Sequence, residues 1–256
     1  MIDARAVVSP QAELAADVTV GPYTVIGPQV HIDSGSIIEA HAVLSGPTRL
    51  GRDNHVHSFA SLGSAPQDQK YRGEPTRLEV GDRNVFREFC TINRGTTHDE
   101  GVTRIGDDNL FMAYSHVAHD CRVGSHTVFA NCASLAGHVE VQDWVILGGL
   151  TAVHQFSRLG AHAFLAGGAI VQRDVPPYVM VQGNPATPHA VNAEGLKRRG
   201  FGEAQIRQIR EAYRLLYRSD LLLAEALKQL EPLAQQHAEI RVFVDFISHS
   251  KRSLVR

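Results

Sequence analysis

Large apolar side chains recur at every sixth position through the first two thirds of the chain. The positions that carry this repeat are Ile2, Val8, Leu14, Val20, Ile26, Ile32, Ile38, Leu44, Leu50, Val56, Leu62, Val80, Phe86, Ile92, Ile105, Phe111, Val117, Val123, Phe129, Leu135, Val141, Leu147, Val153, Leu159, Leu165 and Val171. An α-helix cannot bury them together, because six residues advance it by ~600° and successive side chains then point in different directions. Six-residue strands joined by tight corners bury them readily, because each strand sends one large side chain into a narrow core.

The residue four positions after each large one is usually small or β-branched, as at Ala12, Thr24, Ala42, Cys121 and Ala133. Each predicted strand therefore turns one large and one small side chain inward. Three such strands make a triangular coil of about eighteen residues, and stacked coils form a parallel sheet along each side of a prism. We therefore expect a mainly β solenoid rather than the alternative, a β-sandwich with regularly spaced strands.

Two polar, turn-rich segments, 63–79 and 93–104, interrupt the repeat. Insertions in a solenoid leave it as loops on the outside, often at the functional face. We expect the repeat to end near Val171, because Pro176 and Pro177 cannot donate the backbone hydrogen bonds of a further strand.

The composition then changes to a helical pattern, which predicts a solenoid domain over 1–187 and a helical domain over 188–256. The expected helices, with Pro232 between the last two, cover 203–217, 221–230 and 233–249. The first of them places one apolar stripe along its length, made of Ile206, Ile209, Ala212, Tyr213 and Leu216. This helical tail can cover the last coil, whose open strand edges would otherwise favour end-to-end aggregation.

The overall charge is nearly balanced, with 25 Lys and Arg residues against 27 Asp and Glu residues. This balance argues against a general nucleic-acid binder. No apolar run approaches the ~18 residues of a membrane span, and the first residues lack the basic stretch and apolar core of a secretory signal. Cys90, Cys121 and Cys132 form no CxxC motif and cannot all pair, so we expect a reducing, cytoplasmic location.

Histidines are numerous, 14 in all, and several of them are separated by about the length of one coil. His119 and His138 are nineteen residues apart, and His154 follows sixteen residues later, so stacked coils bring them to one edge of the prism. A neutral imidazole in such a groove can act as a general base, and the adjacent Asp120 can orient His119. Zinc binding and ordinary hydrogen-bonded surface histidines are the alternative interpretations.

Two further segments carry candidate binding residues. Asp68, Lys70 and Tyr71 lie in the first inserted segment, and the basic run 197–199 begins the helical tail. Such a basic run suits a diphosphate or an acidic carrier protein, although a solvated helix face has the same composition. The sequence has no GxGxxG or P-loop motif, so we do not expect a dinucleotide or ATP site.

Several motifs are far more specific than the repeat. They are QDQKYRGEPTR (67–77), HVAHDCRVG (116–124), LAGHVEV (135–141), AVHQF (152–156), DVPPYV (174–179), QGNPATP (182–188) and VNAEGLKRRGF (191–201). With these motifs the chain resembles, from Ile2 to its end, the UDP-N-acetylglucosamine O-acyltransferase family that opens lipid A biosynthesis. The resemblance implies a left-handed parallel β-helix; this hand comes from the family, because the usual crossover rule predicts the opposite one.

The resemblance also implies an activity and an assembly. Members of the family are cytoplasmic homotrimers that move an (R)-3-hydroxyacyl chain from acyl carrier protein to the 3-hydroxyl of UDP-N-acetylglucosamine. Acyl transfer from a thioester needs a base, an oxyanion donor and positioning. We therefore expect no metal ligands and no resident cofactor, because phosphopantetheine arrives on the acyl carrier protein, and we expect neither a nucleic-acid partner nor an integral membrane span.

The matching motifs carry residue roles over to this chain. His119 corresponds to the family's catalytic base, Asp120 to its orienting partner and the Gly137 N–H to its oxyanion donor. Gly167 matches the residue that limits acyl length, and a glycine there leaves room for a longer chain. The substrate contacts that the resemblance implies are Asp68 and Lys70 for the sugar nucleotide, His116, His138, His154 and Gln155 for the sugar and acyl site, and Asn192, Glu194, Arg198 and Arg199 for diphosphate, uridine or the pantetheine arm.

Two positions depart from the family pattern. The segment TINRGT (91–96) carries Asn93 where the family usually has histidine, and Gln69 replaces the usual leucine. The first departure keeps open an acceptor sugar with a 3-amino group in place of the hydroxyl. The repeat is also compatible with the later N-acyltransferase of the same pathway, an acetyl-CoA-dependent acetyltransferase, a metal-dependent γ-class carbonic anhydrase and a non-catalytic scaffold.

Overall fold

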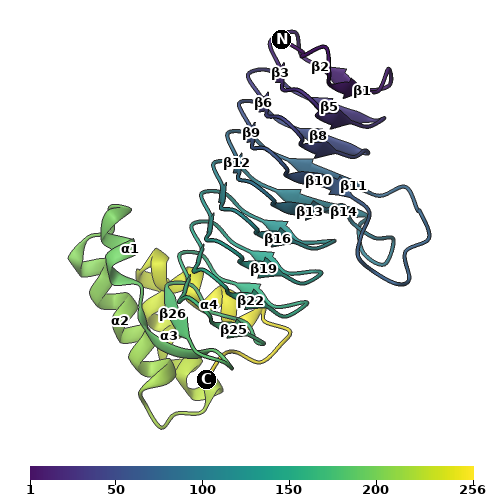
Figure 1. Cartoon of the computed structure of the whole chain (residues 1–256). Helices are drawn as coiled ribbons and strands as arrows, with labels where there is room; N and C mark the ends of the chain where they lie inside the picture. The colour runs from purple at the N-terminus through teal and green to yellow at the C-terminus, as the bar shows by residue number, and fades with distance from the viewer.

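The computed structural model describes residues 1–256 as a β-solenoid with helices packed at its C-terminal end (Figure 1). Each coil is a triangle of short strands, and the coils stack into three sheets. The solenoid is a left-handed parallel β-helix, so the expected fold class is confirmed. None of the helices has the length and apolar character needed to cross a membrane.

The chain passes through the three sheets in the same order in every coil. Sheet 1 contains β1 (Val7–Val8), β4 (Val25–Ile26), β7 (Val43–Leu44), β10 (Ser61–Ser64), β13 (Thr91–Asn93), β16 (His116–Val117), β19 (Ser134–Leu135), β22 (Ala152–Val153) and β25 (Ile170–Val171). Sheet 2 contains β2 (Glu13–Leu14), β5 (Val30–Ile32), β8 (Thr48–Leu50), β11 (Arg77–Val80), β14 (Val102–Ile105), β17 (Arg122–Val123), β20 (Glu140–Val141) and β23 (Arg158–Leu159). Sheet 3 contains β3 (Thr19–Val20), β6 (Ile37–Ile38), β9 (His55–Val56), β12 (Val85–Phe86), β15 (Leu110–Phe111), β18 (Val128–Phe129), β21 (Ile146–Leu147), β24 (Phe164–Leu165), β26 (Val179–Gln182) and β27 (Thr187–Val191). We name each corner by the two sheets that it joins in chain order: corner 1–2 leads from sheet 1 to sheet 2, corner 2–3 from sheet 2 to sheet 3, and corner 3–1 from sheet 3 to sheet 1 of the next coil.

The core has the composition that the period of six predicts. Val7 pairs with Val25 and Val8 with Ile26, which sets one coil at eighteen residues. Every large periodic residue is buried except Ile2, Val8 and Leu14, which lie in the first coil at the open end of the prism. The small partners beyond the first coil are buried as well, as Thr24 and Cys121 illustrate. A narrow core filled by one large and one small residue per strand therefore accounts for the repeat.

Stacked side chains inside the prism connect successive coils. Phe86, Phe111 and Phe129 are fully buried in sheet 3, with ring centroids 4.9 and 4.7 Å apart. At corner 2–3, the side-chain oxygen of Asn54 accepts hydrogen bonds from the backbone and side chain of Asn84, at 2.9 and 3.0 Å. These ladders satisfy the buried polar groups of the corners and hold the coils in register.

Both interruptions of the repeat leave the solenoid at corner 1–2, on the same side of the molecule (Figure 1). The first loop runs from 65 to 76, between β10 and β11, and the second from 94 to 101, between β13 and β14. The expected segments 63–79 and 93–104 thus include the ends of the flanking strands. Those ends are ordered because β11 pairs with both β8 and β14.

The repeat does not end near Val171, which corrects that expectation. Pro176 and Pro177 occupy a corner, and the strand β26 follows them and pairs with β24 through Met180 and Phe164. A proline at a corner does not have to donate a ladder hydrogen bond, so it does not prevent a strand immediately afterwards. The strand β27 then turns back antiparallel to β26. The expected boundary at 187/188 falls at the start of β27, and the first helix begins at Ala193.

Four helices follow: α1 (Ala193–Arg198), α2 (Glu203–Tyr217), α3 (Leu223–Gln236) and α4 (Ala238–Ser248). The predicted helix 203–217 and its buried stripe are confirmed. The predicted break at Pro232 is wrong, because α3 continues through it and ends at Gln236. Leu230 and Ala234, which flank the proline, are both buried. Their packing offsets the hydrogen bond that proline removes from a helix interior.

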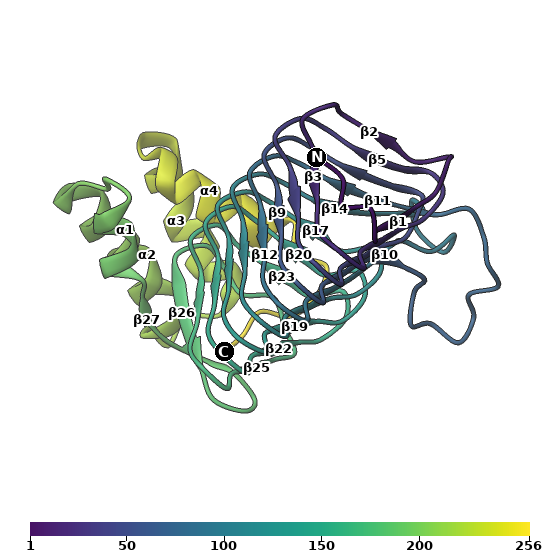
Figure 2. The ribbon, with the colours of Figure 1, turned by 45° about the horizontal axis from the view of Figure 1, so that its top comes forward.

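The short helix α1 lies beside α2 (Figure 2), and the residues that flank it are attached to corner 2–3. Asn192 caps α1 and also donates a hydrogen bond to the backbone oxygen of His162. The Arg199 guanidinium lies 5.1 Å from the ring centre of Trp144 and donates to Nδ1 of His162 at 3.1 Å. Burial, reinforced by the Arg199 charge, lowers the pKa of His162 to about 4. This contact therefore requires a neutral imidazole.

The His162 contact predicts a loss of stability in mild acid. Between pH 6.5 and 4 the unfolded chain binds a proton at His162 while the folded chain does not, so stability falls as the pH falls. We expect this residue to account for about 2 kcal/mol of the loss between pH 7.5 and 4.5. Urea unfolding of wild type and His162→Gln at both pH values measures it. An equal loss in the two proteins would contradict the assignment.

Candidate active site

Corner 1–2 places the same backbone position of successive coils one above the other. Asp120, His138 and Phe156 are eighteen residues apart along the sequence, and each has a left-handed backbone conformation, with φ of 60°, 61° and 63°. His119, Gly137 and Gln155 directly precede them. Both inserted loops leave the solenoid at this corner, so they form one wall of the space beside it.

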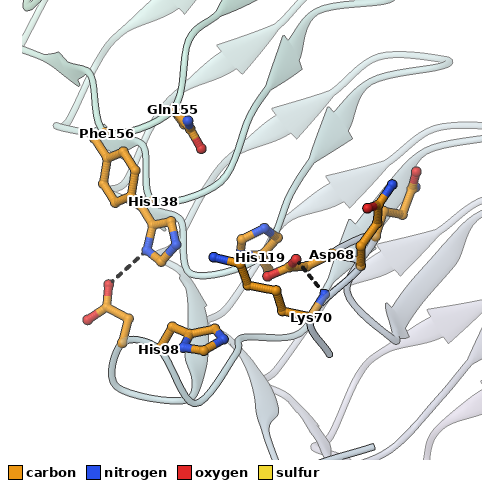
Figure 3. Close-up of a pocket in the computed structure, with 10 residues that line it drawn as sticks. Asp68, Lys70, His98, His119, His138, Gln155 and Phe156 are labelled. Atoms are coloured by element: carbon orange, nitrogen blue, oxygen red, sulfur yellow. Dashed lines mark hydrogen bonds and ion pairs between the residues drawn. The ribbon is translucent and has the colours of Figure 1, made fainter. Parts of the chain in front are cut away.

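A cavity of about 700 Å³ lies between this corner and the two loops. Its lining residues are Gln67, Asp68, Gln69, Lys70, His98, Asp99, His119, His138, Gln155 and Phe156. Figure 3 shows Lys70 extending from the first loop toward the two imidazoles of His119 and His138. The size is typical of a small-molecule site, and nearly all of the lining is polar.

His119 is held by the buried carboxylate of Asp120. His119 Nδ1 donates to Asp120 Oδ2 at 2.8 Å, and the Asp120 side chain is only 1% exposed. Burial raises the pKa of Asp120, but the hydrogen bonds from His119 and Thr96 outweigh it and hold the pKa below its ordinary value. An ionised Asp120 fixes the proton on Nδ1 of His119. The other ring nitrogen, Nε2, is then an acceptor that can take a proton.

Thr96, in the second loop, is the other partner of Asp120. Its backbone N–H donates to Asp120 Oδ1 at 2.8 Å, and its hydroxyl donates to Oδ2 at 2.7 Å. The Asp120 N–H in turn donates to the Thr103 hydroxyl at 2.8 Å. Asp120 therefore connects corner 1–2 to the second loop, and this loop fixes the direction from which the carboxylate meets His119.

His138, one coil further on, packs edge-on against His119 with ring centroids 5.1 Å apart. Its Nδ1 lies 3.1 Å from Asp99 Oδ2, and its Nε2 lies 3.8 Å from Asp120 Oδ2. The Phe156 ring of the following coil stacks on it at 4.5 Å. His138 is thus fixed from three sides, and one face of the cavity is rigid.

Position 137 has to be glycine for His119 to occupy its place. A Cβ atom there would lie 2.6 Å from Cε1 and 2.8 Å from Nε2 of His119. The imidazole therefore lies directly against the Gly137 backbone. The Gly137 N–H donates to no acceptor within the chain, so this donor is free beside the reactive edge of the histidine.

The first loop brings Asp68 and Lys70 to the cavity. Asp68 accepts a hydrogen bond from the Lys70 N–H at 2.9 Å, which lowers the pKa of the Asp68 carboxyl. Arg94 holds this loop through bonds to the Tyr71 hydroxyl at 3.0 and 3.2 Å. Asn93 also supports the loop, since its buried amide donates to the Ala65 oxygen at 3.1 Å. Of the two residues that depart from the family pattern, Asn93 therefore anchors a wall of the cavity without lining it, whereas Gln69 is part of the lining.

Apart from Asp120 and Gly137, three of the expected site residues in the solenoid lie outside the cavity lining. His116 is partly buried in β16 and hydrogen-bonds with Thr91 at 2.7 Å, and burial lowers its pKa. His154 is exposed and hydrogen-bonds with the Gln155 backbone oxygen at 3.1 Å. Gly167 lies at corner 3–1, where an added Cβ would lie 3.4 Å from the Gly149 oxygen. Of the expected residues, the cavity is thus lined by His119, His138, Gln155, Asp68 and Lys70. Asp120 and Gly137 lie behind them.

The expected residues of the helical tail lie at a different edge of the prism. Asn192 and Arg199 bind His162 at corner 2–3. Glu194 pairs with Lys197 at 3.3 Å, and Arg198 is exposed. Within one protomer, α1 therefore belongs to corner 2–3 and the cavity to corner 1–2.

Sequence reasoning missed Thr96, which holds Asp120, and the lining residues Gln67, His98, Asp99 and Phe156. Phe156 was detectable, because it follows His138 by the length of one coil. Thr96 belongs to the motif 91–96, but its bond to Asp120 depends on the path of the second loop. His98 and Asp99 lie in that same loop, and only their position in an inserted segment could have indicated that they line the cavity.

The same cluster has donor atoms that suit a metal ion. His119, Asp120 and His138 offer donor atoms that lie within 4.8 Å of one another. However, Nδ1 of His119 and both oxygens of Asp120 already take part in hydrogen bonds, and so does Nδ1 of His138. An ion would have to replace the contact that orients His119, so the arrangement favours proton transfer over coordination.

Comparison with known proteins gives one consistent family. The chain is 54% identical over 255 residues to the acyl-(acyl carrier protein)–UDP-N-acetylglucosamine O-acyltransferase of Thiobacillus denitrificans, covering 100% of this chain and 99% of that one. The structure matches Francisella novicida UDP-N-acetylglucosamine acyltransferase with a TM-score of 0.98 at 39% identity, over 100% and 94% of the two chains. It matches LpxA from Acinetobacter baumannii with a TM-score of 0.97 at 42% identity, over 100% and 99%.

Two family descriptions also match parts of the chain. Residues 174–255 match "Udp N-acetylglucosamine O-acyltransferase; Domain 2". Residues 11–46 and 103–137 match the bacterial transferase hexapeptide family, described as six repeats. The first match covers the last corner and the helices, and the second covers parts of the solenoid.

The contacts of Asp120 predict a cost for removing the Thr96 hydroxyl. Thr96→Val deprives a buried carboxylate oxygen of one donor, so we expect a loss of about 1–3 kcal/mol in the free energy of unfolding at pH 7. Thr19→Val, at an exposed strand position, is the control and should change it by less than about 0.5 kcal/mol. Urea unfolding of the three proteins measures both effects, and a Thr96→Val protein as stable as wild type would contradict the role of the hydroxyl.

Proposed function

The chain belongs to the UDP-N-acetylglucosamine O-acyltransferase family, and we propose that it transfers an (R)-3-hydroxyacyl chain from acyl carrier protein to the 3-hydroxyl of UDP-N-acetylglucosamine. This reaction is the first step of lipid A biosynthesis. The observation that supports the proposal best is the hydrogen bond from His119 to buried Asp120, at 2.8 Å, beside a polar cavity. It supplies the general base that an attacking hydroxyl requires.

His119 is the proposed base. As the sugar 3-hydroxyl oxygen attacks the thioester carbonyl, Nε2 of His119 takes its proton and a C–O bond forms. The tetrahedral intermediate then breaks its C–S bond, and the proton on Nε2 passes to the departing pantetheine thiolate. Asp120 remains ionised throughout, because the charges and hydrogen bonds around it lower its pKa, and it stabilises the imidazolium formed between the two steps.

Gly137 is the proposed oxyanion donor. Its N–H is free of other acceptors and lies beside the His119 ring. A backbone donor at this place stabilises the negative charge that develops on the thioester oxygen, and it needs no reorganisation during the reaction. Base and oxyanion donor would then come from adjacent coils, at positions fixed by the stacking of the solenoid.

The walls of the cavity supply the proposed substrate contacts. Asp68 and Lys70 would bind the sugar nucleotide, and His138 and Gln155 would contact the sugar and the acyl group. His116 and His154, which lie just outside the lining, would contribute at the margins of the same site. Gly167 is the proposed limit on acyl length; because glycine has no side chain, it would leave room for a long chain.

We propose a homotrimer because the site is incomplete within one protomer. Asn192, Glu194, Arg198 and Arg199 lie at another edge, and only a second copy would bring them to the cavity, where the arginines would meet diphosphate or the pantetheine arm.

The proposed reaction needs no resident cofactor, because the acyl group and its phosphopantetheine both arrive on acyl carrier protein. The three cysteines are free thiols, and two of them are buried. Free thiols fit a reducing compartment, so a cytoplasmic location remains our proposal.

Turnover assays test the function. Purified protein is incubated with UDP-N-acetylglucosamine and (R)-3-hydroxyacyl carrier proteins of several chain lengths, with UDP-linked 3-amino sugar as a second acceptor. We expect ester product from the hydroxyl acceptor, and a loss of about 10²–10⁴-fold in kcat for His119→Ala. His31→Ala, at the opposite end of the solenoid, is the matched control and should retain full activity. Product only from the amino sugar would establish the alternative acceptor, and an active His119→Ala protein would remove His119 from the mechanism.

Gly137→Ala gives a second kinetic test. The added methyl group would displace the His119 imidazole, from which it would lie 2.6 Å, so we expect kcat to fall at least tenfold with far-UV circular dichroism unchanged. Gly202→Ala, where the nearest atom lies 3.7 Å from the new Cβ, is the control. Wild-type turnover in Gly137→Ala would show that the close contact of ring and backbone is not needed.

A further inference from the structure

A second cluster of imidazoles and a carboxylate lies on sheet 3, away from the cavity. Glu39 directly follows β6, His55 lies in β9, and His57 directly follows β9. The strands pair in register, with Ile37 opposite His55 and Ile38 opposite Val56. Alternate residues of a strand project from the same face, so His55, His57 and Glu39 are outward-facing neighbours on two adjacent coils.

The donor atoms of the cluster lie close together, and Nε2 of His55 shares a hydrogen bond with Oε1 of Glu39 that a bound ion would replace. Oε1 of Glu39 lies 2.8 Å from Nε2 of His55 and 3.1 Å from Nδ1 of His57. The two imidazoles stack with centroids 4.0 Å apart. All three groups bring a donor atom within 4.8 Å of the others. Two ligand atoms at about 2.0–2.1 Å from a tetrahedral zinc ion lie about 3.3 Å apart, so the observed separations are close to those of a coordinated set.

The carboxylate is oriented by a separate residue. Ser58 donates its N–H and its hydroxyl to Oε2 of Glu39, at 3.2 and 3.3 Å. This leaves Oε1 for the two histidines. Outer contacts of this kind fix ligand direction in metal sites. The side chains of Glu39 and His55 are each 34% exposed and that of His57 is 18% exposed, so solvent can supply a further ligand.

We propose that Glu39, His55 and His57 form a binding site for a divalent transition-metal ion, Zn²⁺ in the first place, completed by water. Two imidazoles and a carboxylate are a ligand set that zinc accepts, and imidazole selects it over magnesium or calcium. The site would join the coils of β6 and β9. It takes no part in acyl transfer, because it lies on the outer face of sheet 3 and the cavity lies at corner 1–2.

The proposed ion would link two adjacent coils and stabilise the folded solenoid. Its ligands come from two segments that are sixteen to eighteen residues apart, and only the folded solenoid brings them together. Binding to the folded chain alone stabilises it in proportion to the logarithm of ion concentration. We therefore expect Zn²⁺ to raise the Tm of the protein, and this rise to be absent in Glu39→Gln.

Cobalt(II) titration of the whole protein, purified without a polyhistidine tag, tests the site. Bound Co²⁺ gives visible absorption bands that report its ligands, and Zn²⁺ should displace it. We expect Glu39→Gln and His57→Gln each to weaken cobalt binding by at least about tenfold. His31→Gln is the matched control: His31 contacts the carboxylates of Glu13 and Asp33 but no second imidazole, so binding should be unchanged.

His119→Gln separates this site from the histidines of the cavity. Cobalt bands that vanish in His119→Gln and persist in Glu39→Gln would overturn the proposal, and so would equal binding by wild type and both cluster variants. Circular dichroism establishes that each variant is folded. Because Glu39 and His57 lie on different coils, either folded variant decides the result. The experiment measures cobalt binding and not turnover. A failure of the metal site would therefore leave the proposed acyl transfer unaffected, and a failure of the proposed acyl transfer would leave the metal site unaffected.

Discussion

The fold depends on a core so narrow that each strand can bury only one large and one small side chain. This constraint fixes the length of a coil at eighteen residues, as the pairing of Val7 with Val25 shows. It also fixes the corners, because a corner residue of one coil lies directly above that of the coil before. A side chain at one corner therefore lies beside the side chain at the same corner of the next coil. In this way Asp120, His138 and Phe156 come together without any residue from the core.

The two inserted loops form, together with corner 1–2, the walls of the cavity. The solenoid supplies His119 and the glycine backbone against which its ring lies. The second loop supplies Thr96, whose two donors hold the buried carboxylate of Asp120, and the first supplies Asp68 and Lys70. A rigid stack thus sets the spacing of His119 and the Gly137 backbone, while loops of less regular structure supply further side chains to the cavity, as is usual for loops on a rigid scaffold.

The sequence predicted the solenoid and the first long helix, and it placed His119 and His138 at one edge of the prism, because a strict period translates directly into stacking. It did not predict that a strand follows Pro176 and Pro177. Proline cannot donate a ladder hydrogen bond within a strand, but at a corner no such bond is required. It placed a break at Pro232, where the packing of Leu230 and Ala234 outweighs the lost hydrogen bond. Thr96, Asp99 and the cluster around Glu39 were out of reach, because their contacts depend on loop paths and on pairs of side chains from different coils.

The central claim is that Asp120 fixes the proton of His119 on Nδ1 and leaves Nε2 free to act as the base. Nitrogen-15 NMR of protein labelled in its histidines reports this directly, because protonated and unprotonated ring nitrogens have distinct shifts. The His119 signals are assigned by their absence from His119→Gln, at pH 8. We predict a protonated Nδ1 and an unprotonated Nε2 for His119. A proton on Nε2 would contradict the account, because that nitrogen could then not accept one from the sugar hydroxyl.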